Sequence, residues 1–371
     1  MRRRLAVFVT IIQALLFAGH ALVYKTVIFF WPTLAAPPGG IPWLKIGLAA
    51  LSITFVTASL LAMRTPNILV RIYYTLSAVW LGTFSFLFFA AAALWPIYGL
   101  ASLIGFRPDK STFALPFFSL ALGASLYGLI NAASLRVKRI TVRLQNLPPS
   151  WKGRTAALVS DVHLGHVRNL GFIRRIVKVV TQLRPDLVFL TGDFYDGTAA
   201  AFNRLAEPWT ALSPPLGKYF VLGNHEGFSD STRYLNAIGS AGIRILNKEK
   251  VEIDGLQLVG VHYHDATHAE HFRSVLAGIG IDRSRPSILL THAPDQVPVS
   301  AEAGISLQLD GHTHGGQFFP FNLFVKRIYR QFAYGLSRLD KLQCYTTSGA
   351  GTWGPPMRVG TNPEIVLLRI E

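Results

Sequence analysis

Short segments rich in Asp, His and Asn lie scattered between residues 161 and 314. In the first, Asp161 and His163 are two residues apart, a spacing that puts both side chains on one face of an extended loop. A carboxylate and an imidazole together suit Mn²⁺, Fe or Zn²⁺. Such a pair is common in unrelated sequences, so by itself it is weak evidence and favours an aspartate that caps a helix.

Four further segments repeat this chemistry. They are Asp193 in TGD, Asn224 and His225 in GNHE, His292 in TH, and His312 and His314 in GHTH. Each is ambiguous singly, but together they place carboxylate, amide and imidazole groups after five apolar runs. Because Cys344 is the single cysteine, a cysteine-based zinc cluster is excluded. The joint pattern therefore indicates a metal site with nitrogen and oxygen ligands.

The apolar runs that precede these segments indicate buried strands. They are TAALV, DLVFL, KYFVL, SILL and ISLQL, and helix-like stretches at 170–183 and 231–241 lie between them. Strands that alternate with helices predict an α/β sandwich, in which ligands bind at loops after the strands. The alternating stretch RVKRITVR predicts an opening strand, so we expect this domain to cover residues 136–371.

Residues 1–135 have a different character. Half of the whole chain is apolar and 15% is charged, and Asp109 is the one acidic residue before position 136. A membrane-spanning helix needs about 20 mostly apolar residues. Four runs qualify, at 5–31, 43–63, 72–104 and 112–134; Pro96 interrupts the third, for which we expect one helix with a kinked or interfacial extension. Residues 1–135 thus predict an all-α transmembrane bundle of about four helices.

Basic residues flank these runs unequally. One side of the membrane would carry Arg2, Arg3, Arg4, Arg64, Arg71, Arg136, Lys138, Arg139 and Arg143, and the other side Lys45, Arg107 and Lys110. Since the richer side is usually cytoplasmic, we expect a multi-pass protein of the inner (plasma) membrane whose C-terminal domain is cytoplasmic. The alternative, a cleaved secretory signal at the first run, is disfavoured by the three apolar runs that follow.

The order DxH, GD, GNH(E/D), H, GHxH resembles the calcineurin-like metallophosphoesterase superfamily over about residues 150–371. SDVHLG, THAPD, GHTHGGQ and GTWGPPMRVGTNPEI are similar to a bacterial membrane-associated branch that includes envelope phosphodiesterases and UDP-diacylglucosamine pyrophosphatases. The resemblance implies a four-layer α/β sandwich and two divalent metal ions, Mn, Fe or Zn. One ion would be held by Asp161, His163, Asp193 and His314, and the other by Asp193, Asn224, His292 and His312.

The resemblance also implies a catalytic role for His225, which would protonate the leaving group or stabilise the transition state. Glu226 would orient His225; many family members have Asp here, so this Glu is a small departure. His264, in the histidine-rich HYHDATHAEH, and Arg358, in PPMRVG, are candidate substrate contacts. A third metal site at His264, His268 and His271 is the less favoured alternative to a loop near the mouth of the site.

The stretch QFFPFNLFVKRIYRQFAYGL mixes aromatic and basic residues. Such a mixture suits a membrane interface or a lipid-bearing substrate, although it also occurs in proteins that bind single-stranded nucleic acid. A cap over the domain core is the structural alternative. The preceding apolar runs favour membrane contact over nucleic acid.

Together these features predict a membrane-anchored phosphoesterase that cleaves a phosphodiester or pyrophosphate bond in a lipid-linked or envelope substrate. The bilayer and this phosphorylated substrate are the expected partners, with no obligate protein partner and no nucleic acid. One alternative is a nuclease or cyclic-nucleotide phosphodiesterase acting on soluble substrates. The other is a membrane sensor or transporter with a ligand-binding metal domain, which the scarcity of ionisable residues in the apolar runs, His20 and Lys25, disfavours.

Overall fold

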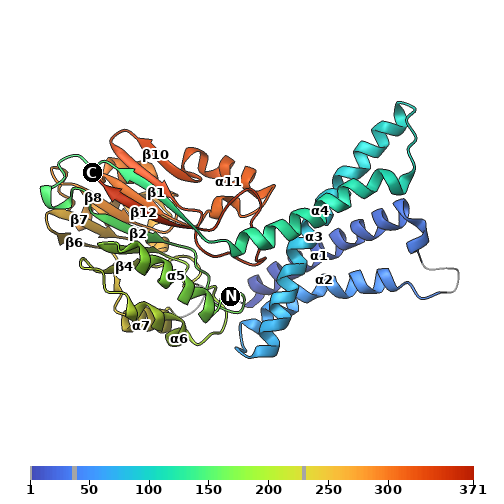
Figure 1. Ribbon diagram of the computed structural model, residues 1–371, viewed down its shortest axis with the longest axis horizontal. Helices are drawn as coiled ribbons and strands as arrows, with labels where there is room; N and C mark the ends of the chain where they lie inside the picture. Colours follow the sequence, from blue (N-terminus) through green and yellow to red (C-terminus); the bar gives the residue numbers. More distant parts are fainter. Residues whose placement is uncertain (1, 36–39, 228–230) are drawn as a thin grey trace. The chain divides into compact units, whose positions relative to one another are not determined.

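The computed structural model describes residues 2–35, 40–227 and 231–371. It divides into two compact units (Figure 1). The first comprises Met1–Ile130 with Gly354–Met357, and the second Asn131–Trp353 with Arg358–Glu371. The predicted domain boundary between residues 135 and 136 stays a prediction.

The first unit consists of long apolar helices. They are α1 (Arg2–Phe30), α2 (Trp43–Ala62), α3 (Ile68–Leu103) and α4 (Lys110–Ala133), with a 3-10 turn η1 (Pro32–Leu34) after α1. Within the described residues these four helices are long and apolar enough to cross a membrane, which confirms the predicted bundle. α3 continues past Pro96 as one helix of 36 residues. Its length of about 54 Å exceeds a hydrocarbon core of about 30 Å, so the predicted extension is part of the same helix.

Polar side chains inside this unit are paired between helices. The indole Nε1 of Trp80 donates to His20 Nε2 at 3.0 Å, and that of Trp95 donates to Thr26 Oγ1 at 2.8 Å. Both tryptophans on α3 therefore bind α1, which favours packing within the bundle over placement at the membrane interface. The predicted membrane orientation depends partly on Arg2–Arg4, whose side chains lie outside the described residues.

The second unit contains two six-stranded mixed sheets. The first has the order β1-β12-β2-β3-β4-β5 and the second β10-β11-β9-β8-β7-β6. The first comprises β1 (Arg136–Val142), β2 (Thr155–Val159), β3 (Leu187–Thr191), β4 (Lys218–Val221), β5 (Arg244–Ile245) and β12 (Glu364–Ile370). The second comprises β6 (Glu249–Ile253), β7 (Leu256–Gly260), β8 (Ser287–Leu290), β9 (Leu307–Asp310), β10 (Gly335–Leu339) and β11 (Leu342–Thr346).

Helices cover the outer face of each sheet (Figure 1). The longer ones are α5 (Leu170–Leu183), α7 (Thr232–Ser240) and α9 (Ala269–Ile279), and the shorter ones α6 (Phe202–Ala206), α8 (Tyr263–Ala266) and α10 (Val297–Glu302). Helix α11 (Phe321–Tyr329) has no buried residue among those described. Single 3-10 turns lie at η2 (Pro149–Trp151), η3 (Glu207–Ala211), η4 (His314–Gly316) and η5 (Arg330–Phe332). This is the predicted α/β sandwich with four layers.

The alternation of side chains along each strand explains the layers. In β2, Ala156 and Leu158 face the core between the sheets, whereas Ala157 and Val159 face the helices. β2, β3 and β4 run parallel to one another, as do β8 and β9. The carboxyl ends of the parallel strands in each sheet therefore share an edge, and their following loops come together.

Candidate metal centre

The predicted ligands follow the carboxyl ends of five strands. Asp161 and His163 come after β2, Asp193 after β3, Asn224 after β4, His292 after β8, and His312 and His314 after β9. Three of these strands, β2, β3 and β4, belong to the first sheet, and β8 and β9 belong to the second. The loops of the two sheets meet where the His312 amide donates to Asp161 Oδ1 at 3.0 Å. The fold thus assembles segments that are far apart in the sequence.

Strained backbone marks most of these positions. Asp161, His163, Asp193, His312 and His314 all have φ between 49° and 69°, in the left-handed region that residues other than glycine rarely occupy. Such strain costs of the order of 1–3 kcal/mol per residue and persists where surrounding structure enforces it, commonly at functional sites. Here it turns the five side chains toward a common point.

Two glycines permit the close approach of neighbouring loops. A Cβ at Gly192, whose φ is 82°, would lie 2.5 Å from His292 Nδ1 and 2.6 Å from the Gly223 amide. A Cβ at Gly223 would collide with the Asp193 carboxylate and lie 2.5 Å from its amide. Larger residues at these two positions would separate the ligands on β3, β4 and β8.

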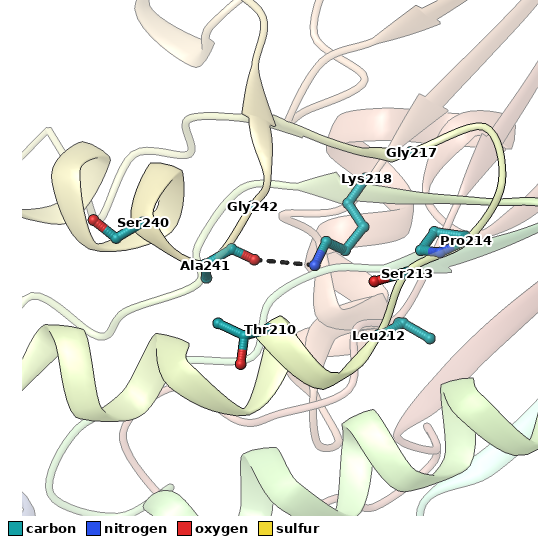
Figure 2. Close-up of a pocket in the computed structure, with 9 residues that line it drawn as sticks. All are labelled: Thr210, Leu212, Ser213, Pro214, Gly217, Lys218, Ser240, Ala241 and Gly242. Atoms are coloured by element: carbon teal, nitrogen blue, oxygen red, sulfur yellow. Dashed lines mark hydrogen bonds between the residues drawn. The ribbon is translucent and has the colours of Figure 1, made fainter.

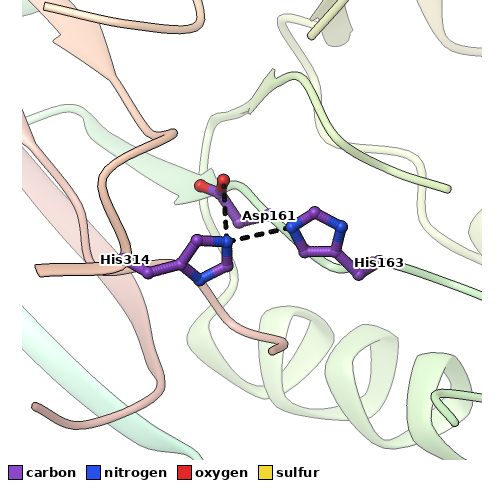
Figure 3. Close-up of side chains that lie close together, drawn as sticks. All are labelled: Asp161, His163 and His314. Atoms are coloured by element: carbon purple, nitrogen blue, oxygen red, sulfur yellow. Dashed lines mark hydrogen bonds and ion pairs between the residues drawn. The ribbon is translucent and has the colours of Figure 1, made fainter. Parts of the chain in front are cut away.

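The first group of predicted ligands is Asp161, His163 and His314 (Figure 3). His163 Nε2 is 3.0 Å from His314 Nε2, which is itself 3.5 Å from Asp161 Oδ1. Asp193 Oδ2 lies 3.7 Å from His163 Nε2. All four side chains are buried, so lone pairs from two imidazoles and two carboxylates face one enclosed space.

The second group is Asp193, Asn224, His292 and His312. His292 Nδ1 donates to the Thr191 carbonyl at 2.7 Å, so in the neutral ring Nε2 carries a lone pair. That atom lies 3.1 Å from Asn224 Oδ1, 3.2 Å from Asp193 Oδ2 and 3.3 Å from His312 Nδ1. A cluster dominated by acceptors fits a cation, and its donor set matches that of Mn²⁺, Fe or Zn²⁺.

The electrostatics also favour cation binding. Burial, together with nearby positive groups, holds the pKa of His163 and of His314 well below the ordinary value, and burial lowers the pKa of His312 to about 3. These rings are therefore neutral, the form that ligates metals. Burial raises the pKa of Asp161 to about 6, whereas for Asp193 the opposing effect of His292 outweighs burial and lowers the pKa. Two buried carboxylates in one site require compensating positive charge.

His225 lies beside both groups. Its Nδ1 donates to the Asp196 carbonyl at 3.0 Å, and its amide donates to Asp193 Oδ1 at 2.9 Å. The ring meets that of His163 edge-on, with centroids 4.7 Å apart, and its Nε2 is 3.9 Å from Asp193 Oδ2. The ring is therefore oriented with Nε2 toward the ligand cluster.

Glu226 contacts the backbone of two neighbouring loops. This fully buried carboxylate accepts from the amides of Asp193 and Gly223 through Oε2, at 3.1 and 2.9 Å, and from that of Tyr195 through Oε1 at 3.1 Å. Glu226 thus joins the loop after β3 to the loop after β4. Its geometry favours a role in holding Asp193 and Asn224 together over orientation of His225.

The environment of Arg358 also differs from that of a substrate contact. Its side chain is fully buried, and the guanidinium donates to the carbonyls of His314 at 2.7 Å and of Ser348 and Gly351 at 2.6 Å. Nη2 also lies 3.1 Å from His314 Nδ1. A phosphate could not reach this group without rearrangement, so the geometry favours positioning of His314.

The second histidine group does not share one helix face. His264 lies in α8, His268 caps α9, and His271 lies in α9, where its Nε2 is 2.9 Å from Asp265 Oδ1. Among the described residues, the groups able to hold a metal do not include these three. His264 is exposed and its ring lies against Gly227, just after the GNHE segment, which is compatible with the predicted substrate contact.

Aromatic side chains at the site escaped the sequence-based prediction. Tyr263 lies against the rings of His312 and His292, with centroids 5.4 and 5.7 Å apart, and Trp353 lies 5.8 Å from His225. The Tyr329 ring, from α11, is 6.2 Å from that of His312. The sequence contains only a weak signal for Tyr263 and Trp353. Their segments, HYHDATHAEH and GTWGPP, were singled out for their histidines and for the family resemblance.

A surface pocket of about 390 Å³ lies elsewhere in this unit, lined by Thr210, Leu212, Ser213, Pro214, Gly217, Lys218, Ser240, Ala241 and Gly242 (Figure 2). Lys218 begins β4, whereas Asn224 follows the other end of that strand. The Lys218 ammonium donates to the carbonyls of Trp209 and Ala241, at 2.5 and 3.0 Å. The ammonium group therefore links two loops at the sheet edge opposite the metal centre.

Comparison with known proteins gives consistent matches. Residues 155–316 match the family model of calcineurin-like phosphoesterases. An uncharacterized metallophosphoesterase of Aquifex aeolicus is 33% identical over 69% of this chain and 98% of its own length. One of Helicobacter pylori strain J99 is 32% identical over 70% of this chain and 71% of its own.

A relative from Danio rerio is named a transmembrane protein with a metallophosphoesterase domain. It is 32% identical over 65% of this chain, and the match spans 59% of the relative's length.

Proposed function

This chain belongs to the calcineurin-like phosphoesterase family and is a hydrolase, and we propose that it cleaves a phosphodiester or pyrophosphate bond in a lipid-linked envelope substrate. We further propose that the reaction takes place at the cytoplasmic face of the inner membrane, where the flanking basic residues would place the second unit.

The observation that carries the proposal is the meeting of seven ligand-type side chains from five loops in one buried space. We propose that Asp161, His163, Asp193 and His314 hold one divalent ion, and that Asp193, Asn224, His292 and His312 hold the other. Asp193 lies between the two groups, with Oδ2 within 3.7 Å of both His163 and His292. A shared carboxylate offsets the repulsion between two cations.

The bound ions would supply Lewis-acid stabilisation of the phosphoryl oxygens and a lowered pKa for the attacking water. The chain's own residues fix geometry and protons. Because His225 Nδ1 donates to the Asp196 carbonyl, Nε2, which faces Asp193 Oδ2 at 3.9 Å, is the ring nitrogen that would carry a proton toward a leaving oxygen. Glu226 and Arg358 hold the ligand-bearing loops in position, and neither needs to contact the substrate.

The lipid-linked substrate is supported by three features. Four apolar helices precede the hydrolase unit, α4 ends at Ala133 three residues before β1 begins, and the exposed Trp353 lies beside His225. A soluble substrate would need none of these.

Turnover by the full-length protein in lipid nanodiscs tests the proposal. With Mn²⁺ present, we expect hydrolysis of bis-p-nitrophenyl phosphate and faster hydrolysis of a nucleotide-linked diacylated sugar embedded in the bilayer. His225→Ala should lower both rates by about 10²- to 10⁴-fold, the usual contribution of a general acid. Exposed His268→Ala is the matched control and should retain full activity.

Two results would contradict the proposal. Inactivity toward both substrates with Mn²⁺, Fe²⁺ and Zn²⁺ would exclude the phosphoesterase assignment. Faster turnover of a cyclic nucleotide or an oligonucleotide than of the bilayer-embedded lipid would instead support the soluble-substrate alternative.

A further inference from the structure

The hydrolase unit exposes its large apolar side chains in one part of the chain. Among the described residues from 131 onward, those that are both large and exposed all lie between positions 319 and 353. They are Phe319, Phe321, Leu323, Phe324, Ile328, Tyr334, Leu336 and Trp353. An exposed apolar group concentrated in this way usually marks an interaction site.

Helix α11 contributes most of this group. None of its described residues is buried. At about 100° per residue, Phe321, Phe324 and Ile328 share one stripe of the helix. Ile328 is 69% exposed and Phe324 60% exposed. Among the described residues, the helix therefore presents an exposed apolar stripe.

The other side of α11 faces the hydrolase unit. The Asn322 backbone lies where a Cβ on Gly316 would be, and Tyr329 packs beside His312. By helical geometry, Asn322 and Tyr329 lie roughly opposite Phe324. The stripe thus points away from the unit, while the same helix contacts a predicted metal ligand.

Trp353 adds a second aromatic group beside the site. Its backbone is held by the Gln317 side chain, which donates to the Trp353 carbonyl and accepts from its amide, both at 2.9 Å. The indole is 58% exposed although its ring lies 5.8 Å from His225. Exposed apolar groups therefore lie both on α11 and at the rim of the metal centre.

The charge around the stripe selects an anionic partner. Lys326, Arg327 and Arg330 are exposed on or next to α11, and residues 319–339 include no acidic side chain. Apolar and aromatic side chains next to basic ones match the boundary between anionic headgroups and acyl chains. A second copy of the chain would bring the same positive charges together, which disfavours it as the occupant.

We propose that α11, with Phe319 and Trp353, forms a bilayer-docking surface that inserts among the headgroups of an anionic membrane. The surface brings the mouth of the metal centre to the depth at which a lipid phosphate lies. The role of docking in lipid hydrolysis rests on the proposed function. Docking itself can be measured without any hydrolysis.

Site-specific fluorescence in nanodiscs tests docking on the full-length protein. Cys344 is fully buried, so a cysteine introduced at an exposed position is the one that reacts with a pyrene label. We compare Ile328→Cys with Ser274→Cys, an exposed position on α9. Nitroxide-bearing lipids should quench the label at position 328 and not that at 274. Quenching should be stronger with phosphatidylglycerol present than in pure phosphatidylcholine.

Two outcomes would overturn docking. Equal, weak quenching by lipid at both positions, with equal access to aqueous iodide, would show that α11 stays in water. Excimer emission from labelled position 328 in liposomes, without lipid quenching, would assign the surface to a second copy of the chain.

A charged variant then connects docking to turnover. Phe324→Glu with Ile328→Glu should abolish lipid quenching at a label on position 321 and slow hydrolysis of the embedded lipid by about tenfold or more, with bis-p-nitrophenyl phosphate turnover unchanged. Ser274→Glu with Ala277→Glu on α9 is the control. Equal turnover of the lipid by variant and wild type would overturn the role of docking in catalysis. Lack of any hydrolysis by wild type, with quenching intact, would refute the proposed function and leave docking supported.

Discussion

Asp193 receives contacts from several parts of the site. Its amide donates to Glu226, its Oδ1 accepts from the His225 amide, and its Oδ2 faces His163 and His292. The residue therefore depends on its neighbours for its position as much as on its own strand. Glu226, which holds Asp193, and Arg358, which holds His314, can be tested separately from the ligands.

Glu226→Gln should destabilise the protein by about 1–3 kcal/mol, because the new amide NH₂ would face backbone N–H donors in a buried space. It should also weaken metal binding. Thermal unfolding in detergent and metal titration would measure the two effects. Exposed Glu302→Gln is the control. Wild-type stability with a loss of turnover alone would instead favour the predicted contact with His225.

Arg358→Lys should raise the metal concentration needed for half-maximal activity and leave KM for phosphoester unchanged. A lysine ammonium cannot reach the carbonyls of His314, Ser348 and Gly351 together as the guanidinium does. Activity measured against metal and substrate concentration separates the two parameters, with exposed Arg338→Lys as control. A rise in KM alone would point to the phosphate contact.

The loops after the parallel strands approach one another so closely that small residues are required between them. Gly223→Ala should lower turnover by about 10²-fold, since a Cβ there collides with the Asp193 carboxylate and displacements of about 1 Å in a catalytic group have such effects. Gly278→Ala, in α9 with open space around it, should keep full activity. Equal kinetics for the two variants would contradict this account of the loop packing.

Most elements were predictable because their patterns are local. α5 begins and ends at the predicted residues 170 and 183, with Asn169 capping Gly171 and the apolar side facing the sheet. The third apolar run forms one helix that continues past Pro96, since in long apolar helices proline is tolerated where neighbours satisfy the freed backbone groups. The roles of Glu226 and Arg358 depend on loops joined only by the tertiary fold, which local patterns do not contain.

The candidate ligands were predictable for a different reason. Each follows an apolar strand, parallel strands bring together the loops of one sheet, and the family resemblance implied which residues share an ion. Tyr263 and Trp353 carry no such signature, because an aromatic residue in a loop has many uses. Their place beside His312 and His225 becomes evident only once both sheets are assembled.

The basic residues that flank the apolar helices predict the side of the membrane on which hydrolysis occurs. A reporter fused after Glu371 should be active in the cytoplasm, since an even number of spans would return the chain to the side of its basic N-terminus. Alkaline phosphatase and green fluorescent protein fusions give opposite readings for the two sides. A signal from the external fusion would contradict the proposed orientation and leave the hydrolase chemistry intact.

The proposed two-metal centre depends on strained residues, on converging loops and on both sheets. Metal content and hydrolysis of the purified full-length protein, compared with Asp193→Ala, test it most directly. We predict about two divalent ions per wild-type chain, with loss of bound metal and of turnover by several orders of magnitude in the variant. A variant that retains wild-type metal content and hydrolysis would contradict the account.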